Sequence, residues 1–178
     1  VVLTEKTMKK VEHFGSLEKV ILFFPESITL QQISHRIWKK KASELRKEGF
    51  IVLSCVRDKI NTISGTYYID LDAEEAFQLG MICHSVYSMR NGIADLLASR
   101  GKNLHVFYPS HAAFYIYSIN SMVGQSDICE EIILESDPQY VGAAPGPWKA
   151  YAFGIIPVPQ WCYRFYLRHK KLLSRFKH

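Results

Sequence analysis

The sequence predicts an α/β protein with a doubly wound, mostly parallel, Rossmann-like sheet, and three observations support this class. Short apolar runs typical of buried strands alternate with amphipathic segments typical of helices. Glycine or proline ends many of these segments, as expected where the chain turns between a strand and a helix. A strand, a helix and a second buried strand in succession form a βαβ unit, which requires parallel strands and a right-handed crossover.

The first βαβ unit begins with residues 19–24, a continuous apolar run that ends at a proline. Such a short, bounded run predicts a strand buried on both faces. The helix that follows begins at Thr29 or Ser34 and has its apolar residues at a helical period, with lysines and arginines mostly on the other side. Gly49 ends this helix, and residues 50–56 form the second strand.

The later elements repeat the alternation of strand and helix. Further strands are expected at residues 65–70, 84–88 and 103–108, with a weaker strand or loop at 128–134, and helices at 72–83, 92–100 and 112–122. Asp72 is the expected cap of the first of these helices, because the glutamates of its first turn lie where the helix dipole favours them.

We expect three parts along the chain. Residues 1–18 are an N-terminal extension or the remnant of a missing lobe, residues 19–147 are the Rossmann-like domain, and residues 148–178 are an aromatic and basic segment. The last part includes a helix over about residues 160–176. This helix either lies on an anionic membrane surface or packs its apolar side on the sheet while its cations face water.

Composition and charge disfavour several classes of protein. The net charge of +5 is modest and is carried largely by the last fifteen residues, which argues against a nucleic-acid-binding surface. No apolar run is long enough to span a bilayer, and the first residues do not form a signal peptide. The four cysteines are scattered, so we expect reduced thiols, no metal and a cytoplasmic location. Because the sequence begins at Val1, we expect a piece of a longer protein or a trimmed or processed chain.

The loops that follow the strands are expected to meet at the carboxyl edge of the sheet, where open parallel sheets bind ligands. They contain hydroxyl groups, cations and a histidine, which suit phosphates and a sugar. Arg57 and Lys59, in the second of these loops, are candidate bases or phosphate contacts. The glycine-rich patterns of dinucleotide sites and phosphate loops are absent, as is a nucleophile elbow. An NAD-dependent enzyme and a nucleotide hydrolase are therefore disfavoured.

The turn after the central strand is the main candidate for a phosphate contact. Ser88 is expected where the strand stops, and Asn91 and Gly92 tolerate the positive φ of a sharp turn. The first turn of the next helix offers unpaired backbone N–H groups, and Arg90 can fork onto phosphate oxygens. Asp95 stabilises its own helix or orients Arg90. The alternative is an ordinary strand-to-helix turn with a solvated or salt-bridged arginine.

Several motifs follow one another in a familiar order: Phe24-Pro25-Glu26-Ser27, Gly49-Phe50-Ile51-Val52, Gly65-Thr66, residues 70–77, residues 85–97 and residues 106–110. Over about residues 19–125, the chain resembles the C-terminal, donor-binding lobe of bacterial glycosyltransferases with the two-lobed GT-B fold. Among these it most resembles cell-surface polysaccharide enzymes of the heptosyltransferase type. The sequence shows only one such lobe.

The resemblance implies transfer of a sugar from a nucleoside-diphosphate donor to a glycan or lipid-linked acceptor in envelope or capsular polysaccharide synthesis, without a metal or other cofactor. Its matching positions place Ser88, Arg90, Asn91 and Gly92 at the diphosphate, and Glu26, Ser27 and Thr29 near the phosphates or the sugar. The acceptor and catalytic base would come from a separate N-terminal lobe. Such an enzyme would work in the cytoplasm or at the inner face of the plasma membrane.

Two other functions remain open from the sequence. The chain could be a module that binds a nucleotide or sugar phosphate without catalysis. It could also be a protein-interaction module whose functional part is the C-terminal helix.

Overall fold

The computed structural model describes residues 2–98, 103–123, 129–134, 150–152 and 156–158. The chain divides into two compact units, Val1–Val141 and Gly142–His178. In the second unit, β7 (Ala150–Ala152) and β8 (Ile156–Val158) pair as antiparallel strands. The helix expected over residues 160–176 lies outside the described residues. In the described part of the chain, no helix has the length and apolarity needed to cross a membrane.

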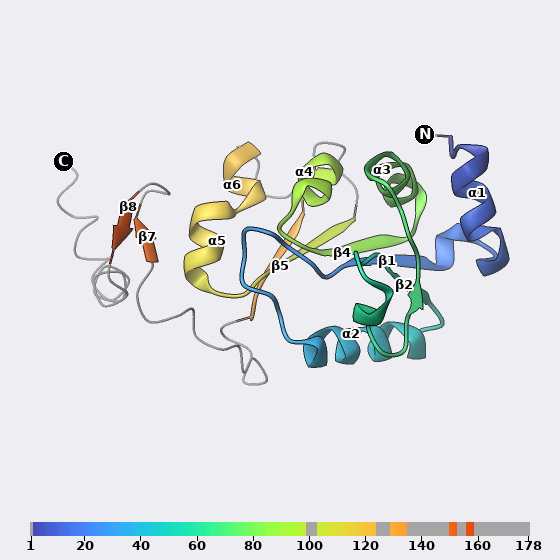
Figure 1. Cartoon of the computed structure of the whole chain (residues 1–178), viewed down its shortest axis with the longest axis horizontal. Helices are drawn as coiled ribbons and strands as arrows, with labels where there is room; N and C mark the ends of the chain where they lie inside the picture. The colour runs from blue at the N-terminus through green and yellow to red at the C-terminus, as the bar shows by residue number, and fades with distance from the viewer. Residues whose placement is uncertain (1, 99–102, 124–128, 135–149, 153–155, 159–178) are drawn as a thin grey trace. The chain divides into compact units, whose positions relative to one another are not determined.

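The first unit alternates strands and helices (Figure 1). Its strands are β1 (Val20–Phe24), β2 (Ile51–Ser54), β3 (Tyr67–Tyr68), β4 (Ser85–Met89), β5 (Leu104–Tyr108) and β6 (Glu130–Ile133). Its α-helices are α1 (Glu5–Val11), α2 (His35–Lys47), α3 (Ala73–Ile82), α4 (Gly92–Ala98), α5 (His111–Tyr117) and α6 (Ile119–Val123). Three 3₁₀ helices are η1 (Glu12–Phe14), η2 (Leu17–Lys19) and η3 (Lys59–Asn61).

All six strands of the first unit are parallel and lie in the order β3-β2-β1-β4-β5-β6. Helix α2 covers one face of the sheet, and α3 and α4 cover the other (Figure 1). The predicted doubly wound, Rossmann-like fold is therefore confirmed, with every strand parallel. The strand order reverses between β1 and β4, which are hydrogen-bonded neighbours.

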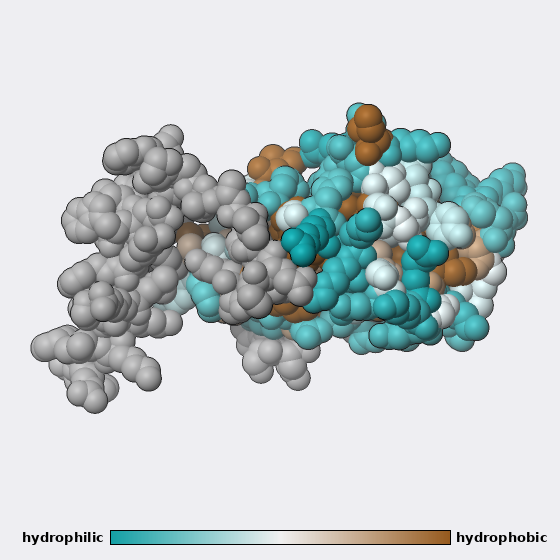
Figure 2. Space-filling model, turned by 90° about the horizontal axis from the view of Figure 1, so that it is seen from below, coloured by the Kyte–Doolittle hydropathy of each residue, from teal (hydrophilic) through white to brown (hydrophobic). Residues whose placement is uncertain are grey.

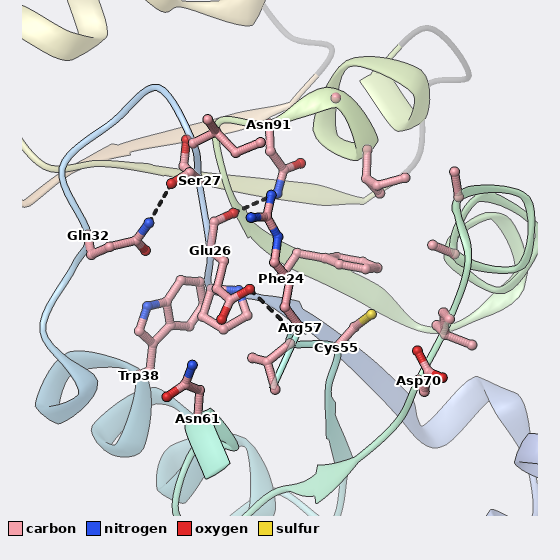
Figure 3. Close-up of a pocket in the computed structure, with 18 of the residues that line it drawn as sticks. Phe24, Glu26, Ser27, Gln32, Trp38, Cys55, Arg57, Asn61, Asp70 and Asn91 are labelled. Atoms are coloured by element: carbon pink, nitrogen blue, oxygen red, sulfur yellow. Dashed lines mark hydrogen bonds between the residues drawn. The ribbon is translucent and has the colours of Figure 1, made fainter. Parts of the chain in front are cut away.

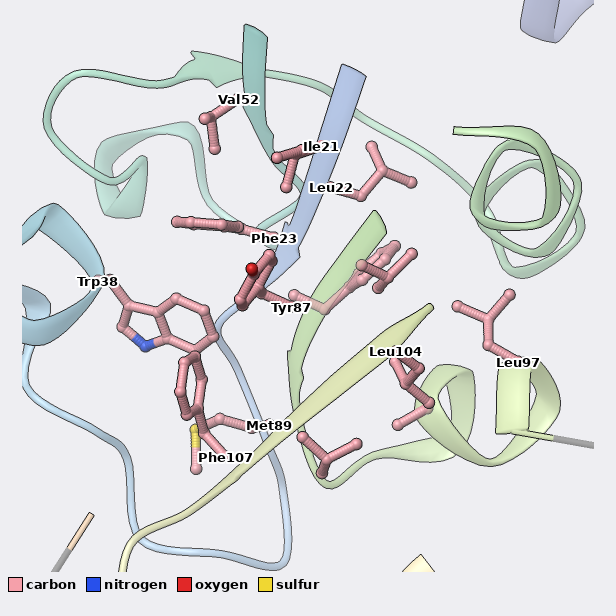
Figure 4. Packing of buried hydrophobic residues seen from close by; sticks show 14 of the residues in the cluster. Ile21, Leu22, Phe23, Trp38, Val52, Tyr87, Met89, Leu97, Leu104 and Phe107 are labelled. Carbon is pink, nitrogen blue, oxygen red and sulfur yellow. The ribbon is translucent and has the colours of Figure 1, made fainter. Parts of the chain in front are cut away.

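The core forms where the sequence predicts strands buried on both faces. Every residue of β1 and of β4 is buried. The apolar side of α2 places Trp38 between Phe23 and Phe107, at ring-centroid distances of 5.1 and 5.0 Å (Figure 4). Seen from below (Figure 2), the surface in the region of α2 is mostly hydrophilic, as expected from its lysine-rich outer side. Gly49 ends α2 at φ +90°, in the left-handed region predicted for it.

Two elements differ from the sequence prediction. The strand expected over residues 65–70 is limited to Tyr67–Tyr68 at the edge of the sheet. The helix expected over residues 112–122 is divided into α5 and α6 at Ser118, whose φ −54° and ψ 123° are not helical. The Ser118 hydroxyl donates to Glu131 and accepts from the Ser121 N–H, so local polar contacts replace the continuous helix.

Helix α1 is fixed to the start of α3 by ion pairs. Lys6 and Lys10 both contact the carboxylate of Glu75, at 3.1 and 2.8 Å, and the Glu75 side chain is only 4% exposed. Asp72 and Glu75 form the two halves of a capping box, which confirms Asp72 as the cap. Burial acts to raise the pKa of Glu75, but hydrogen bonds from Lys10, the Asp72 N–H and Lys6 hold it below the usual 4.5.

This pKa shift predicts a loss of stability in acid. Because the folded-state pKa is lowered, Glu75 stabilises the fold fully above about pH 4.5, and this contribution is lost as the pH falls through the lower folded-state value. We expect the urea midpoint to fall between pH 6 and pH 3, and Glu75→Gln to remove part of that fall. Glu74→Gln, on the same helical turn, is the matched control. Equal pH dependence in the wild type and in Glu75→Gln would contradict this role.

Candidate functional site

A cavity of about 1040 Å³ opens at the carboxyl edge of the sheet (Figure 3). Its walls come from the loop after β1, the segments after β2 and β3, the start of α3 and the start of α4. It therefore lies beside the strand pair β1 and β4, between which the strand order reverses. Open α/β sheets bind ligands at this switch point, and the sequence predicts a ligand site at this edge.

The structure brings half of the eight predicted contacts to the cavity. Those that line it are Glu26, Ser27, Asn91 and Gly92. Those outside its lining are Thr29, Lys59, Ser88 and Arg90. Thr29 is exposed on the loop after β1, and the Lys59 ammonium lies 5.8 Å from the ring centroid of Tyr68.

The loop after β1 is held by its own polar groups. The Ser27 hydroxyl donates to the Arg90 carbonyl at 2.8 Å and accepts from the Leu30 N–H at 3.2 Å. The Gln32 amide donates to the Ser27 carbonyl. Glu26 reaches the next loop, where one of its carboxylate oxygens accepts from the Arg57 N–H at 3.1 Å. Ser27 therefore shapes the cavity wall, while Glu26 keeps its other carboxylate oxygen without a hydrogen bond in the described residues.

Asn91 forms the turn into α4 as a helix cap. Its side-chain oxygen accepts from the Ala94 N–H at 2.9 Å, and its side-chain nitrogen donates to the Glu26 carbonyl at 3.1 Å. Gly92 is the first residue of α4 and is not among the glycines with positive φ. The expectation that Gly92 supplies a left-handed turn is therefore wrong, because the Asn91 side chain makes the turn while the following backbone is already helical.

Arg90 is an internal structural residue in this geometry. Its Nε donates to the Tyr117 carbonyl at 3.0 Å, its Nη1 donates to the Asn91 carbonyl at 3.4 Å, and the guanidinium pairs with Asp95. Its Nη2 also lies 3.4 Å from the Met122 sulfur. These contacts link the end of β4 to α4 and to the α5–α6 region, in place of the predicted diphosphate clamp. The alternative of a salt-bridged arginine, oriented by Asp95, matches the structure.

Ser88 also has an internal partner. Strand β4 continues to Met89, and the Ser88 side chain is completely buried. Its hydroxyl donates to the Met89 carbonyl at 2.6 Å. The predicted place of Ser88, at a strand end facing the ligand, is therefore corrected to a position inside the sheet.

Several polar residues that line the cavity lie outside the eight predicted contacts: Gln32, His35, Asn61, Asp70 and Asp72. Of the two candidates Arg57 and Lys59, only Arg57 lines the cavity. Asp70 was missed because the strand was expected to reach it, whereas β3 ends at Tyr68 and leaves Asp70 beyond the sheet. For Asp70, the signal that could have found it is its position shortly after a strand end, which also selected Glu26.

Cys55 lines the cavity as well, beside these polar groups. Burial raises the pKa of its thiol to about 11. At neutral pH the thiol is therefore protonated and a poor nucleophile. In the described part of the chain, no group of three or more histidine, cysteine, aspartate or glutamate side chains could hold a metal ion.

Asn91 gives a direct test of how the turn is built. Asn91→Ala is expected to lower the free energy of unfolding by about 1–2 kcal/mol, because it removes the cap and the link to the loop after β1. Gly92→Ala is the matched control. A Cβ there meets nothing within 4 Å and φ is not positive, so stability should hold or rise slightly. Urea unfolding followed by circular dichroism measures both, and a larger loss in Gly92→Ala would contradict this geometry.

The parallel sheet, its strand reversal and the cavity beside it define a doubly wound α/β domain of the Rossmann type. No protein-family model and no curated protein matches the sequence. Among solved structures, the fold is similar to that of E. coli ADP-heptose LPS heptosyltransferase II, with a TM-score of 0.51 and 14% identity. The match covers 75% of this chain and 44% of that one, so the chain spans less than half of its neighbour's length. This likeness shows a glycosyltransferase-like fold, consistent with one lobe of the GT-B architecture.

Proposed function

We propose that this chain is the donor-binding lobe of a glycosyltransferase, and that it binds a nucleoside-diphosphate sugar in the cavity at the carboxyl edge of the sheet. The observation that carries the proposal is the place of that cavity, beside the strands where the order of the parallel sheet reverses. The similarity of the fold to a transferase of ADP-heptose supports the same class of donor.

The size and lining of the cavity suit such a donor. Small-molecule sites have volumes of about 300–1,000 Å³ and combine apolar walls with a few polar groups. This cavity, at about 1040 Å³, has apolar walls from Phe24, Ile33 and Ile93, with carboxylate, amide and guanidinium groups around them. It has room for a nucleoside together with phosphate and sugar groups.

In this proposal the lobe binds and orients the donor, and its polar groups hold the part of the donor that leaves. When the bond between the sugar and the diphosphate breaks, negative charge grows on the departing phosphate oxygens, and fixed cations and N–H groups stabilise that charge. The acceptor, a glycan or lipid-linked sugar, and the base that removes its proton would be supplied by a second lobe. The reaction would belong to envelope or capsular polysaccharide synthesis on the cytoplasmic side of the membrane, without a bound cofactor.

Calorimetric titration tests the proposal. The full chain is titrated with ADP, GDP, UDP and CDP, and circular dichroism confirms that each sample is folded. We expect saturable binding of one nucleoside diphosphate in clear preference to the others, which also identifies the donor family. If a folded sample binds none of the four, the chain is not a donor-binding lobe.

A module that binds a sugar phosphate without catalysis is the second candidate. The observation in its favour is that Ser88 and Arg90, two of the predicted diphosphate contacts, are occupied inside the fold. Binding of a simple sugar phosphate without any preference for a nucleoside diphosphate would support this candidate over the transferase lobe.

A further inference from the structure

The polar groups around the cavity differ between the two sides of the strand reversal. On the β4 side, the side chain of Asn91 is already engaged by protein groups. On the β2 and β3 side, the side chains of Arg57, Asn61 and Asp70 all line the cavity. Within the described residues, none of these three side chains has a hydrogen bond or an ion pair. These three side chains therefore give the β2 and β3 side hydrogen-bonding capacity for a ligand.

Arg57 is the one cation among Arg57, Asn61 and Asp70, and its backbone is held in place. Its backbone N–H donates to Glu26, which fixes the start of the side chain at the cavity wall. Figure 3 shows Arg57 beside Glu26 with its guanidinium directed toward Asn91, and with Asn61 and Asp70 on opposite sides of the Arg57 backbone. A guanidinium binds phosphate oxygens through paired N–H groups, a geometry that lysine cannot reproduce.

The neighbouring carboxylates limit what the rest of the ligand can be. Asp70 and Glu26 each offer acceptor oxygens, whereas Asp72 is paired with Lys6. Ionised carboxylates accept hydrogen bonds from hydroxyl groups and repel phosphate, so a second phosphate beside them is unfavourable. The complementary ligand carries one anionic group at Arg57 and hydroxyl groups at Asp70 and Asn61.

We propose that the cavity anchors a sugar phosphate on its β2 and β3 side, with Arg57 on the phosphate and with Asp70 and Asn61 on the hydroxyl groups. This moiety occurs both in the ribose phosphate of a nucleotide and in a sugar 1-phosphate. The inference rests on the proposed function for the identity of the whole donor. It assigns the phosphate contact to Arg57 in place of the turn after β4.

The chain provides a matched control for Arg57. Lys59 is two residues away in the same loop and carries the same charge, but it does not line the cavity. Arg57→Ala and Lys59→Ala therefore change net charge equally, and both residues are exposed, so neither change should unfold the protein. Arg57→Lys keeps the positive charge and removes the paired N–H groups of the guanidinium.

The experiment titrates the full chain and these three variants with ribose 5-phosphate, glucose 1-phosphate, ADP, GDP, UDP and CDP, with urea unfolding as a check on the fold. We expect the Kd to rise at least tenfold in Arg57→Ala. It should rise by a smaller factor in Arg57→Lys and change less than twofold in Lys59→Ala. Asp70→Asn should weaken binding of every ligand in the set, because each carries free hydroxyl groups.

The outcomes separate this inference from the proposed function. If the wild type binds one of the four nucleoside diphosphates and Arg57→Ala binds it equally well, the anchor is overturned and the donor-binding lobe stands. If the wild type binds a simple sugar phosphate through Arg57 but none of the four nucleoside diphosphates, the anchor stands and the nucleotide-sugar donor is rejected. Equal losses of affinity in Arg57→Ala and Lys59→Ala would show that only the net charge matters, and they would overturn the anchor. If none of the six compounds binds, both proposals fail.

Discussion

Arg90→Ala is expected to lower the free energy of unfolding by about 2–4 kcal/mol, because hydrogen bonds to charged groups contribute about 1.5–3 kcal/mol. The guanidinium is nearly buried, with its side chain only 10% exposed, and it contacts the carbonyls of Tyr117 and Asn91 and the carboxylate of Asp95. Its removal leaves the Tyr117 carbonyl with one donor fewer and also removes the packing of the aliphatic stem. Asp95 is partly exposed, so water compensates in part for the ion pair that it loses with Arg90.

Urea unfolding of the Arg90→Ala variant measures this loss. Arg57→Ala is the matched control, because Arg57 is exposed and its guanidinium has no hydrogen bond in the described residues. The two substitutions should thus have different effects: Arg90→Ala lowers stability, and Arg57→Ala lowers ligand affinity. An Arg90→Ala protein with wild-type stability and no affinity for any nucleotide would instead place Arg90 at the ligand, as first predicted from the sequence.

Trp38→Ala is expected to cost about 3–5 kcal/mol, the usual range for removing a large aromatic side chain from a core. Trp38 is completely buried and meets Phe107 edge-on at 83° (Figure 4). Trp38 contributes both to the core and to the cavity, because its ring packs against Phe23 of β1 and Phe107 of β5 and the residue also lines the cavity wall.

Trp38→Phe is the informative companion change. The Trp38 indole N–H is buried and has no hydrogen-bond partner within the described residues. Replacing it with phenylalanine keeps an aromatic ring and removes a polar group that makes no bond, so the loss should be less than half that of Trp38→Ala. Circular dichroism should follow the unfolding, because Trp148 and Trp161 also contribute to fluorescence. Equal losses in the two variants would show that this N–H has a partner.

The fold was predictable because its signals are local and periodic. The apolar runs of β1 and β4 are buried on both faces, as such runs indicate. The capping box at Asp72 and the left-handed Gly49 follow from short-range rules. Parallel connections then bring the loops after the strands to one edge, so Glu26 and Asn91 could be placed together although they lie far apart in sequence.

The roles of individual side chains were harder to predict because they depend on distant contacts. Arg90 is held by the Tyr117 carbonyl, 27 residues further along the chain, and no local pattern indicates that bond. A strand buried on both faces lacks the alternation that would have shown which way Ser88 points. Arg57 and Lys59 share one loop without periodicity, so only the path of that loop distinguishes the residue that lines the cavity.

Hydrogen–deuterium exchange of the full chain, with and without saturating concentrations of ADP, GDP, UDP or CDP, tests most directly whether the cavity is the donor site. We predict slower exchange in the segments that form its walls, residues 25–34, 55–61 and 91–96, with little change at the opposite edge of the sheet. Unchanged exchange in all three segments with all four nucleotides, or protection confined to other parts of the chain, would contradict the assignment of this cavity.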